Sequence, residues 1–394
     1  MATAHSISAV ATAGGKTGSG TSREYYIDRI RVVLTTLVVL HHSAITYGAP
    51  GGWYYRELPT TASLTGILFT LFVSTNQAYF MGFFFLIAGY FTPASYTRKG
   101  PARFFGDRLI RLGIPLAVYG VLLDPLTNSI ARAWGRPPAT AEPFLPDLLH
   151  RIFTADWNNG PLWFAQALLI FSAAYLAWRG WRGDQIRRSD APLPTLSGWF
   201  LTALGVGGGA LLIRQWIPVG ENVFQLQLGY FSSYIFLFAI GTVAWQRNWF
   251  ARLTWKAVGP WVVVSIALLP ALILTAVLSG RFAGKPVNFS GGRSFPAILY
   301  AFWEPFVAWG IIAAYLVWFR SHGNRPSPRW EYLGARAYAV YIVHAPVLVG
   351  IGVALRWWQA PAMAKFAVVG PLACLASLGL ASLVLQIPGA RRVV

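Results

Sequence analysis

The sequence predicts an all-α protein, a polytopic bundle of about ten transmembrane helices. Composition is the first observation behind this fold class: 11% of the 394 residues are charged, 55% are hydrophobic, and the mean hydropathy is +0.50. Soluble domains carry about 25% charged residues, so a soluble chain of this length would lack the charges that solvate its surface. The second observation is that uncharged runs recur along the chain, each long enough for a membrane helix of about 20 residues.

Ten apolar runs are the predicted spans. They cover residues 27–47, 77–97, 111–130, 161–178, 195–216, 228–246, 257–279, 296–319, 337–356 and 366–387. A further apolar stretch, residues 61–73, is short for a span and is predicted to be a re-entrant or interfacial helix. Residues 1–24 are rich in Ala, Ser, Thr and Gly and are predicted to be a disordered cytoplasmic tail, so residues 25–388 form one transmembrane domain.

The distribution of positive charge predicts the orientation. If the N-terminus is cytoplasmic, most of the 32 Lys and Arg residues fall in the cytoplasmic loops, and every such loop is basic. Both termini are therefore expected in the cytoplasm. This pattern also explains the net charge of +19, and with no basic stripe on a soluble domain we expect no nucleic-acid partner. The Arg-rich, Lys-poor usage is typical of a GC-rich bacterium, which favours the bacterial cytoplasmic (inner) membrane.

Cysteine and aromatic residues add little chemistry. Cys374 is the single cysteine and lies in an apolar run, which excludes an intramolecular disulfide. No segment has the spacing of metal ligands, so no metal site is predicted. The aromatic group Trp53-Tyr54-Tyr55 follows the first span on its outward side. It is expected either to anchor the chain at the membrane interface or to stack on a sugar ring.

Titratable side chains inside the predicted spans are the candidate functional residues, because a charge in hydrocarbon is costly. His42, Asp124 and Glu304 lie at similar depth in the outer halves of three spans. A histidine beside a carboxylate would suit a general base. The same residues would also serve as hydrogen-bonding links between helices, and both interpretations stay open. His41 lies about 100° around the helix from His42 and is expected to face elsewhere.

Five segments, in chain order, resemble the acyltransferase-3 family of membrane-bound O-acyltransferases. They are Arg31 and His42 with ten residues between them, 83–90 (FFFLIAGY), 108–115 (RLIRLGIP), 160–164 (GPLWF) and 338–346 (YAVYIVHAP). The resemblance covers residues 23–350, and the segment His41-His42-Ser43 with Tyr47-Gly48 resembles the branch that contains glucan succinyltransferases. Ala88 stands where the family often has Ser, which puts any role for a hydroxyl there in doubt.

The resemblance implies an acyltransferase that moves an acyl group, acetyl or succinyl, from cytoplasmic acyl-CoA to a hydroxyl of an envelope carbohydrate or glycolipid. Acyl-CoA would be a substrate, and no permanently bound cofactor is expected. Arg31 first, then Arg108 and Arg111, would bind the phosphates of CoA. Tyr341 and His344 would line the donor channel.

In the implied reaction His42 removes the proton of the acceptor hydroxyl, and Glu304 or Asp124 orients the imidazole. Transient acylation of His42 is the alternative, and the sequence does not separate the two. A secondary transporter of a small solute is the rival function, since it too would contain buried carboxylates, although we find no internal repeat. A membrane scaffold or receptor is a third class. The sequence does not indicate an oligomeric state.

Overall fold

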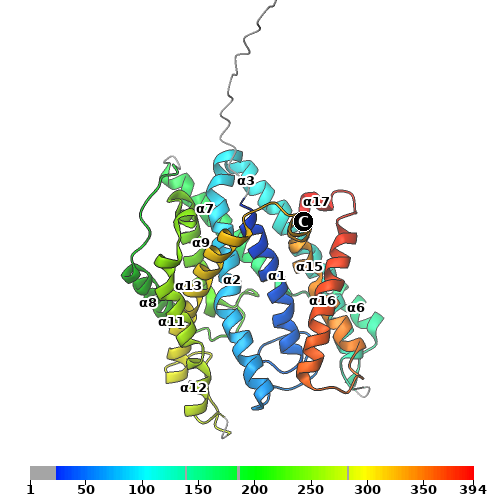
Figure 1. The fold of residues 1–394 in the computed structure, drawn as a ribbon. Coiled ribbons are helices and arrows are strands. Elements are labelled where there is room, and N and C mark those ends of the chain that lie inside the picture. Colours follow the sequence, from blue (N-terminus) through cyan, green and yellow to red (C-terminus); the bar gives the residue numbers. More distant parts are fainter. Residues whose placement is uncertain (1–23, 138–139, 184–186, 282–283) are drawn as a thin grey trace, which may run out of the picture.

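The computed structural model describes residues 24–137, 140–183, 187–281 and 284–394. Within these ranges the regular structure is helical, with a single isolated β-bridge and no strand (Figure 1). The predicted all-α class is therefore confirmed. The predicted disordered tail, residues 1–24, lies outside the described residues except for Glu24.

Nine helical runs in the described ranges are long and apolar enough to cross a membrane. They are Leu64–Lys99 (α2), Pro101–Trp134 (α3 to α5), Gly160–Arg182 (η4 and α7), Leu196–Ile213 (α8), Leu228–Gln246 (η5 and α9), Trp255–Leu278 (α11 and α12), Phe295–Gly323 (α13), Ala337–Ala354 (α15) and Ala362–Val384 (α16). Each coincides with one predicted span. Apart from α1, the remaining helices are short: α6 (Phe144–Phe153), α10 (Trp249–Arg252), α14 (Pro328–Gly334) and α17 (Ala390–Val393).

The tenth predicted span is α1, Tyr25–Thr46, a helix of 22 residues. Its charged first turns and its two histidines lower its hydropathy, so it is not among the nine runs above. It nevertheless packs against α2, α13, α15 and α16, and Figure 1 shows it between α2 and α16. At 1.5 Å per residue it is about 33 Å long, enough to cross the hydrocarbon core of about 30 Å.

The prediction for residues 61–73 is wrong, because this stretch belongs to a continuous helix. Ser63 caps α2 by accepting a hydrogen bond from the Gly66 amide at 3.2 Å, and the helix then runs for 36 residues. Polar residues interrupt the apolar run near Gln77, which makes the stretch look separate. Gln77 faces inward and donates to the Tyr234 hydroxyl at 3.1 Å, so this interruption lines the interior.

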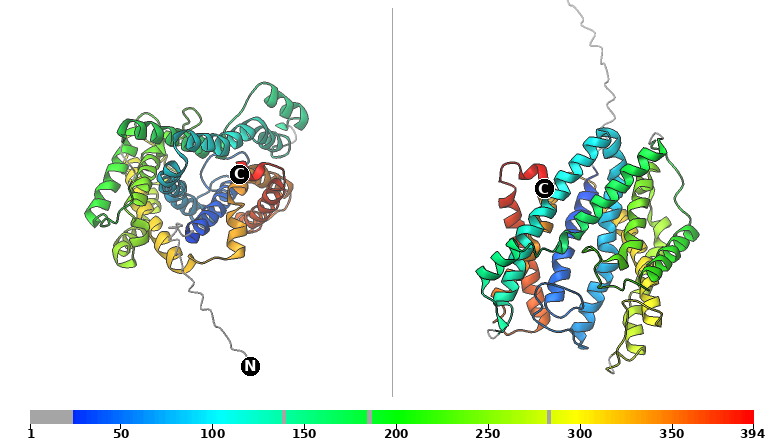
Figure 2. Two further views of the ribbon diagram at one scale, coloured as in Figure 1. Left: turned by 90° about the horizontal axis from the view of Figure 1, so that it is seen from above. Right: turned by 180° about the vertical axis from the view of Figure 1, so that it is seen from behind.

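The run from Pro101 to Trp134 contains two π-helical segments, η1 (Leu109–Gly113) and η2 (Tyr119–Leu123), between α3 (Pro101–Arg108), α4 (Ile114–Val118) and α5 (Asp124–Trp134). It crosses the molecule obliquely, as the right view of Figure 2 shows. Bonds from i to i+5 widen the turn, which changes the side-chain register. Tyr119 and Asp124 consequently contact the same side chain, the Tyr54 hydroxyl.

Close packing of α2 on α9 (Phe231–Gln246) forms the centre of the core. A Cβ atom on Gly89 would overlap the Phe238 carbonyl, and one on Gly241 would overlap the Leu86 carbonyl. Small residues let membrane helices approach closely. Glycine is thus required on both sides of this crossing.

The helices define two faces of the bundle. The start of α1, helices α3 and α17, and the end of the chain lie at one face, which we call the terminal face (Figure 1). The α1–α2 loop, residues 47–63, and α12 (Ala271–Leu278) lie at the opposite face. Ten crossings return the chain to the face from which it started.

Candidate active site

Helix α1 connects the two faces and carries the two residues of the Arg-x10-His pattern. Arg31 lies near its start and His42 near its end, about 16 Å apart at 1.5 Å per residue. His41 is buried and turned away, with its ring 5.0 Å from the ring of Phe80 and edge-on to His42. The two rings thus point in different directions, although both histidines border the cavity described below.

His42 lies within a stack of three rings. The Trp53 indole lies 3.8 Å from the His42 ring with an interplanar angle of 12°. The His344 ring is 5.4 Å from His42 at 16°. His344 Nδ1 is 2.7 Å from the Tyr341 carbonyl oxygen; since a carbonyl only accepts, Nδ1 carries the proton and Nε2 is left as an acceptor.

A cavity of about 650 Å³ borders the histidines. His42 and His41 lie on its wall, and Gly52, Gly220 and Ser290 extend it to the loops of the face opposite the termini. Seven aromatic side chains line it: Phe80, Trp163, Tyr230, Tyr234, Phe289, Tyr300 and Tyr341. Three amide side chains also line it: Gln77, Asn222 and Gln227. This volume falls in the range of small-molecule sites.

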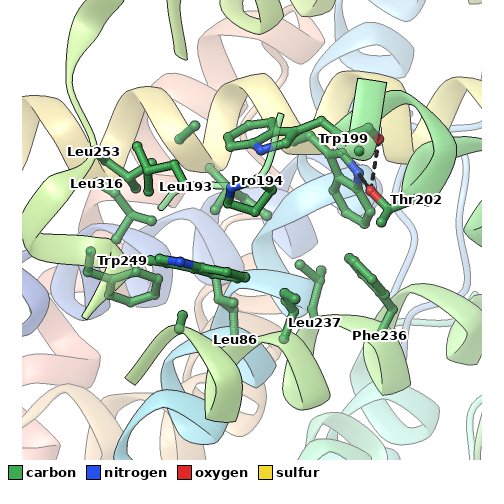
Figure 3. A pocket seen from close by; sticks show the side chains of 17 residues that line it. Leu86, Leu193, Pro194, Trp199, Thr202, Phe236, Leu237, Trp249, Leu253 and Leu316 are labelled. Atoms are coloured by element: carbon green, nitrogen blue, oxygen red, sulfur yellow. Dashed lines mark hydrogen bonds between the residues drawn. The ribbon is translucent and has the colours of Figure 1, made fainter. Parts of the chain in front are cut away.

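A second hollow, of about 130 Å³, lies between α8, α9 and α13 under residues 193–194 (Figure 3). Leu86, Trp199, Phe236 and Leu253 are among the apolar side chains that line it. Its one side-chain hydroxyl, that of Thr202, already accepts from Trp309 Nε1 at 3.2 Å. Its lining is almost wholly apolar and contains no histidine, so the larger cavity is the better candidate for acyl chemistry.

Asp124 belongs to the wall around the α1–α2 loop. Its Oδ1 accepts from the Tyr54 hydroxyl at 2.6 Å, and its Oδ2 accepts from Asn128 and from the Asn158 amide at 3.2 and 3.0 Å. Burial raises the pKa of Tyr54, reinforced by Tyr119 and Asp124, so the hydroxyl stays protonated and donates. Asp124 therefore does not contact His42 itself. It binds Tyr54, the residue that follows Trp53 in the chain, and Trp53 stacks on His42.

Glu304 is paired with a residue that the sequence analysis missed. Arg214, at the end of α8, forms a buried ion pair with Glu304, and its Nε donates to the Gly229 carbonyl at 2.9 Å. The guanidinium lies 5.3 Å from the Tyr230 ring and 5.0 Å from the Tyr300 ring, both on the cavity wall. Arg214 lies inside the predicted span 195–216, near its outer end, where the positive-inside rule does not expect a basic residue. A charged side chain within a span is the signal that could have singled it out.

The expected pairing of His42 with a carboxylate is not found among the described residues. Asp124 and Glu304 have the partners given above, and His42 Nδ1 is enclosed without a hydrogen-bond partner there. His344 lies beside His42, and Tyr341 borders the same cavity as His42; their role along a donor channel stays a prediction. The catalytic roles of His42, Asp124 and Glu304 themselves remain predictions.

The three arginines expected to bind the donor lie toward the terminal face. Arg31 Nη1 is 3.3 Å from Asp28, and its side chain is 39% exposed. Arg108 ends α3 and lies 5.3 Å from the Phe104 ring, and the backbone oxygen of Arg111 in η1 accepts from the Tyr338 hydroxyl at 3.0 Å. Over the described ranges, no cluster of three His, Cys, Asp or Glu side chains is arranged to hold a metal ion.

Comparison with known proteins identifies the family of the chain. The acyltransferase-3 family, described as an acyltransferase domain, matches residues 24–385. Proteins named glucans biosynthesis protein C from Salmonella heidelberg, Salmonella agona and Salmonella dublin are each 23% identical over 341 residues, which is 84% of this chain and 83% of the relative. No solved structure matches. The described residues contain nine apolar helical runs, against which α1 packs as a further helix, and the family match covers nearly the whole chain. This protein therefore belongs to the acyltransferase-3 family and is a multi-pass membrane acyltransferase.

Proposed function

We propose that this enzyme transfers an acetyl or succinyl group from acyl-CoA to a hydroxyl of an envelope carbohydrate or glycolipid at the bacterial cytoplasmic membrane. One observation carries the proposal: His42 borders a cavity of about 650 Å³ that extends to the loops of one face, while the helix that bears His42 carries Arg31 toward the other face.

The cavity supports a carbohydrate acceptor. Aromatic faces such as those of Trp163 and Tyr300 suit the apolar faces of sugar rings, and amide groups such as that of Gln77 donate to and accept from hydroxyls. The relatives named above are glucans biosynthesis proteins, which favours a glucan as the first acceptor to try.

The terminal face supports the donor. Under the positive-inside rule it is cytoplasmic, where acyl-CoA is present, and Arg31, Arg108 and Arg111 lie toward it. Guanidinium groups bind phosphates in a bidentate manner. The pantetheine arm of the donor would pass along α1 to bring the thioester to His42.

At His42 the acceptor hydroxyl oxygen attacks the thioester carbonyl carbon while the imidazole takes the hydroxyl proton. The new C–O bond forms, the C–S bond breaks, and the thiolate takes the proton from the imidazolium. Atoms and charge balance without a metal or a redox partner.

The test uses membrane vesicles that contain the full chain, radiolabelled acetyl-CoA or succinyl-CoA, and a glucan oligosaccharide or the endogenous saccharides. We expect label in the saccharide fraction with wild type, and a loss of at least about 100-fold in His42→Ala. His150→Gln is the matched control, because it alters an exposed imidazole on α6 that does not border the cavity; we expect it to retain activity. If His42→Ala transfers as fast as wild type, the assignment of His42 is wrong. Saccharide flux without transfer of label would favour the transporter.

A further inference from the structure

The α1–α2 loop does not lie on the surface as a simple connection but folds into the bundle and is fixed there. The Tyr54 hydroxyl donates to Asp124 on α5 at 2.6 Å. Glu57 forms an ion pair with Lys365 at the start of α16, with side chains 12% and 5% exposed. The Glu57 amide also donates to the Thr46 carbonyl at 2.9 Å. The loop is thus tied to three helices.

These ties fix Trp53, which lies one residue before Tyr54. Its indole covers the His42 ring at 3.8 Å and lies 5.9 Å from His344. The sequence analysis expected the group Trp53-Tyr54-Tyr55 either at the membrane interface or against a sugar. In the structure Tyr55 is buried and Trp53 stacks on the catalytic candidate His42, and the sugar contact stays a prediction.

The imidazole of His42 lacks the usual means of orientation. A functional histidine is normally held by a hydrogen bond from its second nitrogen to a carboxylate or carbonyl. Within the described part of the chain, His42 Nδ1 is enclosed and has no such partner. The near-parallel stack with Trp53, the closer of the two rings stacked beside His42, therefore restrains the plane of the imidazole.

We infer that Trp53 is a positioning residue, held by the Tyr54–Asp124 and Glu57–Lys365 contacts, which orients His42 for proton transfer in place of a carboxylate. This inference rests on the proposed function. It also reassigns Asp124: this carboxylate acts on the histidine through the loop, by holding Tyr54 and so Trp53, and not by direct contact.

The test measures kcat and KM for acyl-CoA and for the saccharide acceptor in purified, full-length variants. In Trp53→Ala we expect kcat to fall about 10- to 100-fold, the scale of a misplaced catalytic group, while both KM values change less than about twofold. Trp53→Phe keeps a ring on His42 and should recover most of the lost kcat. Trp357→Ala, at a 71% exposed tryptophan, is the matched control and should equal wild type.

Tyr54→Phe removes only the hydroxyl that donates to Asp124. This variant tests the same inference if Trp53→Ala does not accumulate in membranes. It should lower kcat about 3- to 10-fold, and should have no further effect in Trp53→Ala if the loop acts through the indole. An unchanged kcat in Trp53→Ala and Tyr54→Phe would overturn the inference and leave the proposed function standing, as would a Trp53→Phe variant as slow as Trp53→Ala. Loss confined to KM would make Trp53 a substrate contact and overturn it too. Absence of transfer by wild type would overturn both.

Discussion

The ion pair between Arg214 and Glu304 offers a quantitative test of how the cavity wall is built. Both side chains are enclosed, at 1% and 4% exposure, and they join the end of α8 to the middle of α13. Arg214 has further partners in the Gly229 carbonyl and the rings of Tyr230 and Tyr300. Glu304 has Arg214 as its charged partner, and its Oε1 has no hydrogen bond to the described residues.

The magnitude follows from this asymmetry. Removing one member of a buried pair costs about 3–5 kcal/mol of unfolding free energy, because the other charge is left without compensation. Arg214→Met should fall at the upper end, since it leaves a bare carboxylate and also removes the bond to Gly229. Glu304→Leu should fall at the lower end, since the guanidinium keeps a carbonyl and two ring faces. The double variant contains no unpaired charge and should lose only about 1–2 kcal/mol.

The assay is equilibrium unfolding of the purified chain in detergent, for wild type, both single variants and the double variant. The double variant should be more stable than either single variant, with a coupling energy of at least about 3 kcal/mol. Arg293→Met is the control, because this arginine is exposed and lies just before α13. Its unfolding free energy should stay within about 0.5 kcal/mol of wild type. Additive losses in the two single variants would refute the reasoning.

Three further outcomes are expected. Arg31→Ala should raise the KM for acyl-CoA about tenfold or more with a smaller change in kcat, since a charge-assisted phosphate contact contributes about 1.5–3 kcal/mol; initial-rate kinetics would show this, and an unchanged KM would contradict it. Gly89→Ala should lower unfolding free energy by about 1–3 kcal/mol or more, because its Cβ meets the Phe238 carbonyl, whereas Gly106→Ala, with open space around it, should not. Lys365→Met should speed hydrogen exchange across residues 47–58, because Glu57 loses its buried partner; exchange equal to wild type would count against the tie.

The membrane fold was largely predictable because hydrophobicity and loop charge are read directly from the chain. The main error, residues 61–73, arose from a polar interruption near Gln77 that faces a cavity and not lipid. Hydropathy averages over all sides of a helix, so it cannot distinguish a break in the helix from a polar inner face. For the same reason α1, with its charged and imidazole side chains, looks poorer as a span than its packing requires.

The sequence predicted His42 as a candidate residue of the site, but it did not predict which side chains surround His42. The position along each span placed His42, Asp124 and Glu304 at similar depth in the membrane. Depth alone does not say in which direction around its helix each side chain points. The π-helical segment η2 turns Asp124 toward Tyr54, and no residue pattern announces such a segment. The indole of Trp53 reaches His42 only because the loop turns inward, which depends on contacts with Asp124 and Lys365 far along the chain.

The missing carboxylate has a consequence for the chemistry at His42. A buried imidazolium without a counter-ion is costly, so a mechanism that accumulates it would be slow. In acyl transfer from a thioester, the proton taken from the acceptor hydroxyl is needed at once by the departing thiolate, and the imidazole need carry it only briefly. The ring then requires a fixed orientation between the acceptor oxygen and the thioester sulfur more than it requires a partner for its charge. A flat indole held at 3.8 Å supplies orientation without adding charge, which is why a stacked ring is suited to the place where a carboxylate was expected.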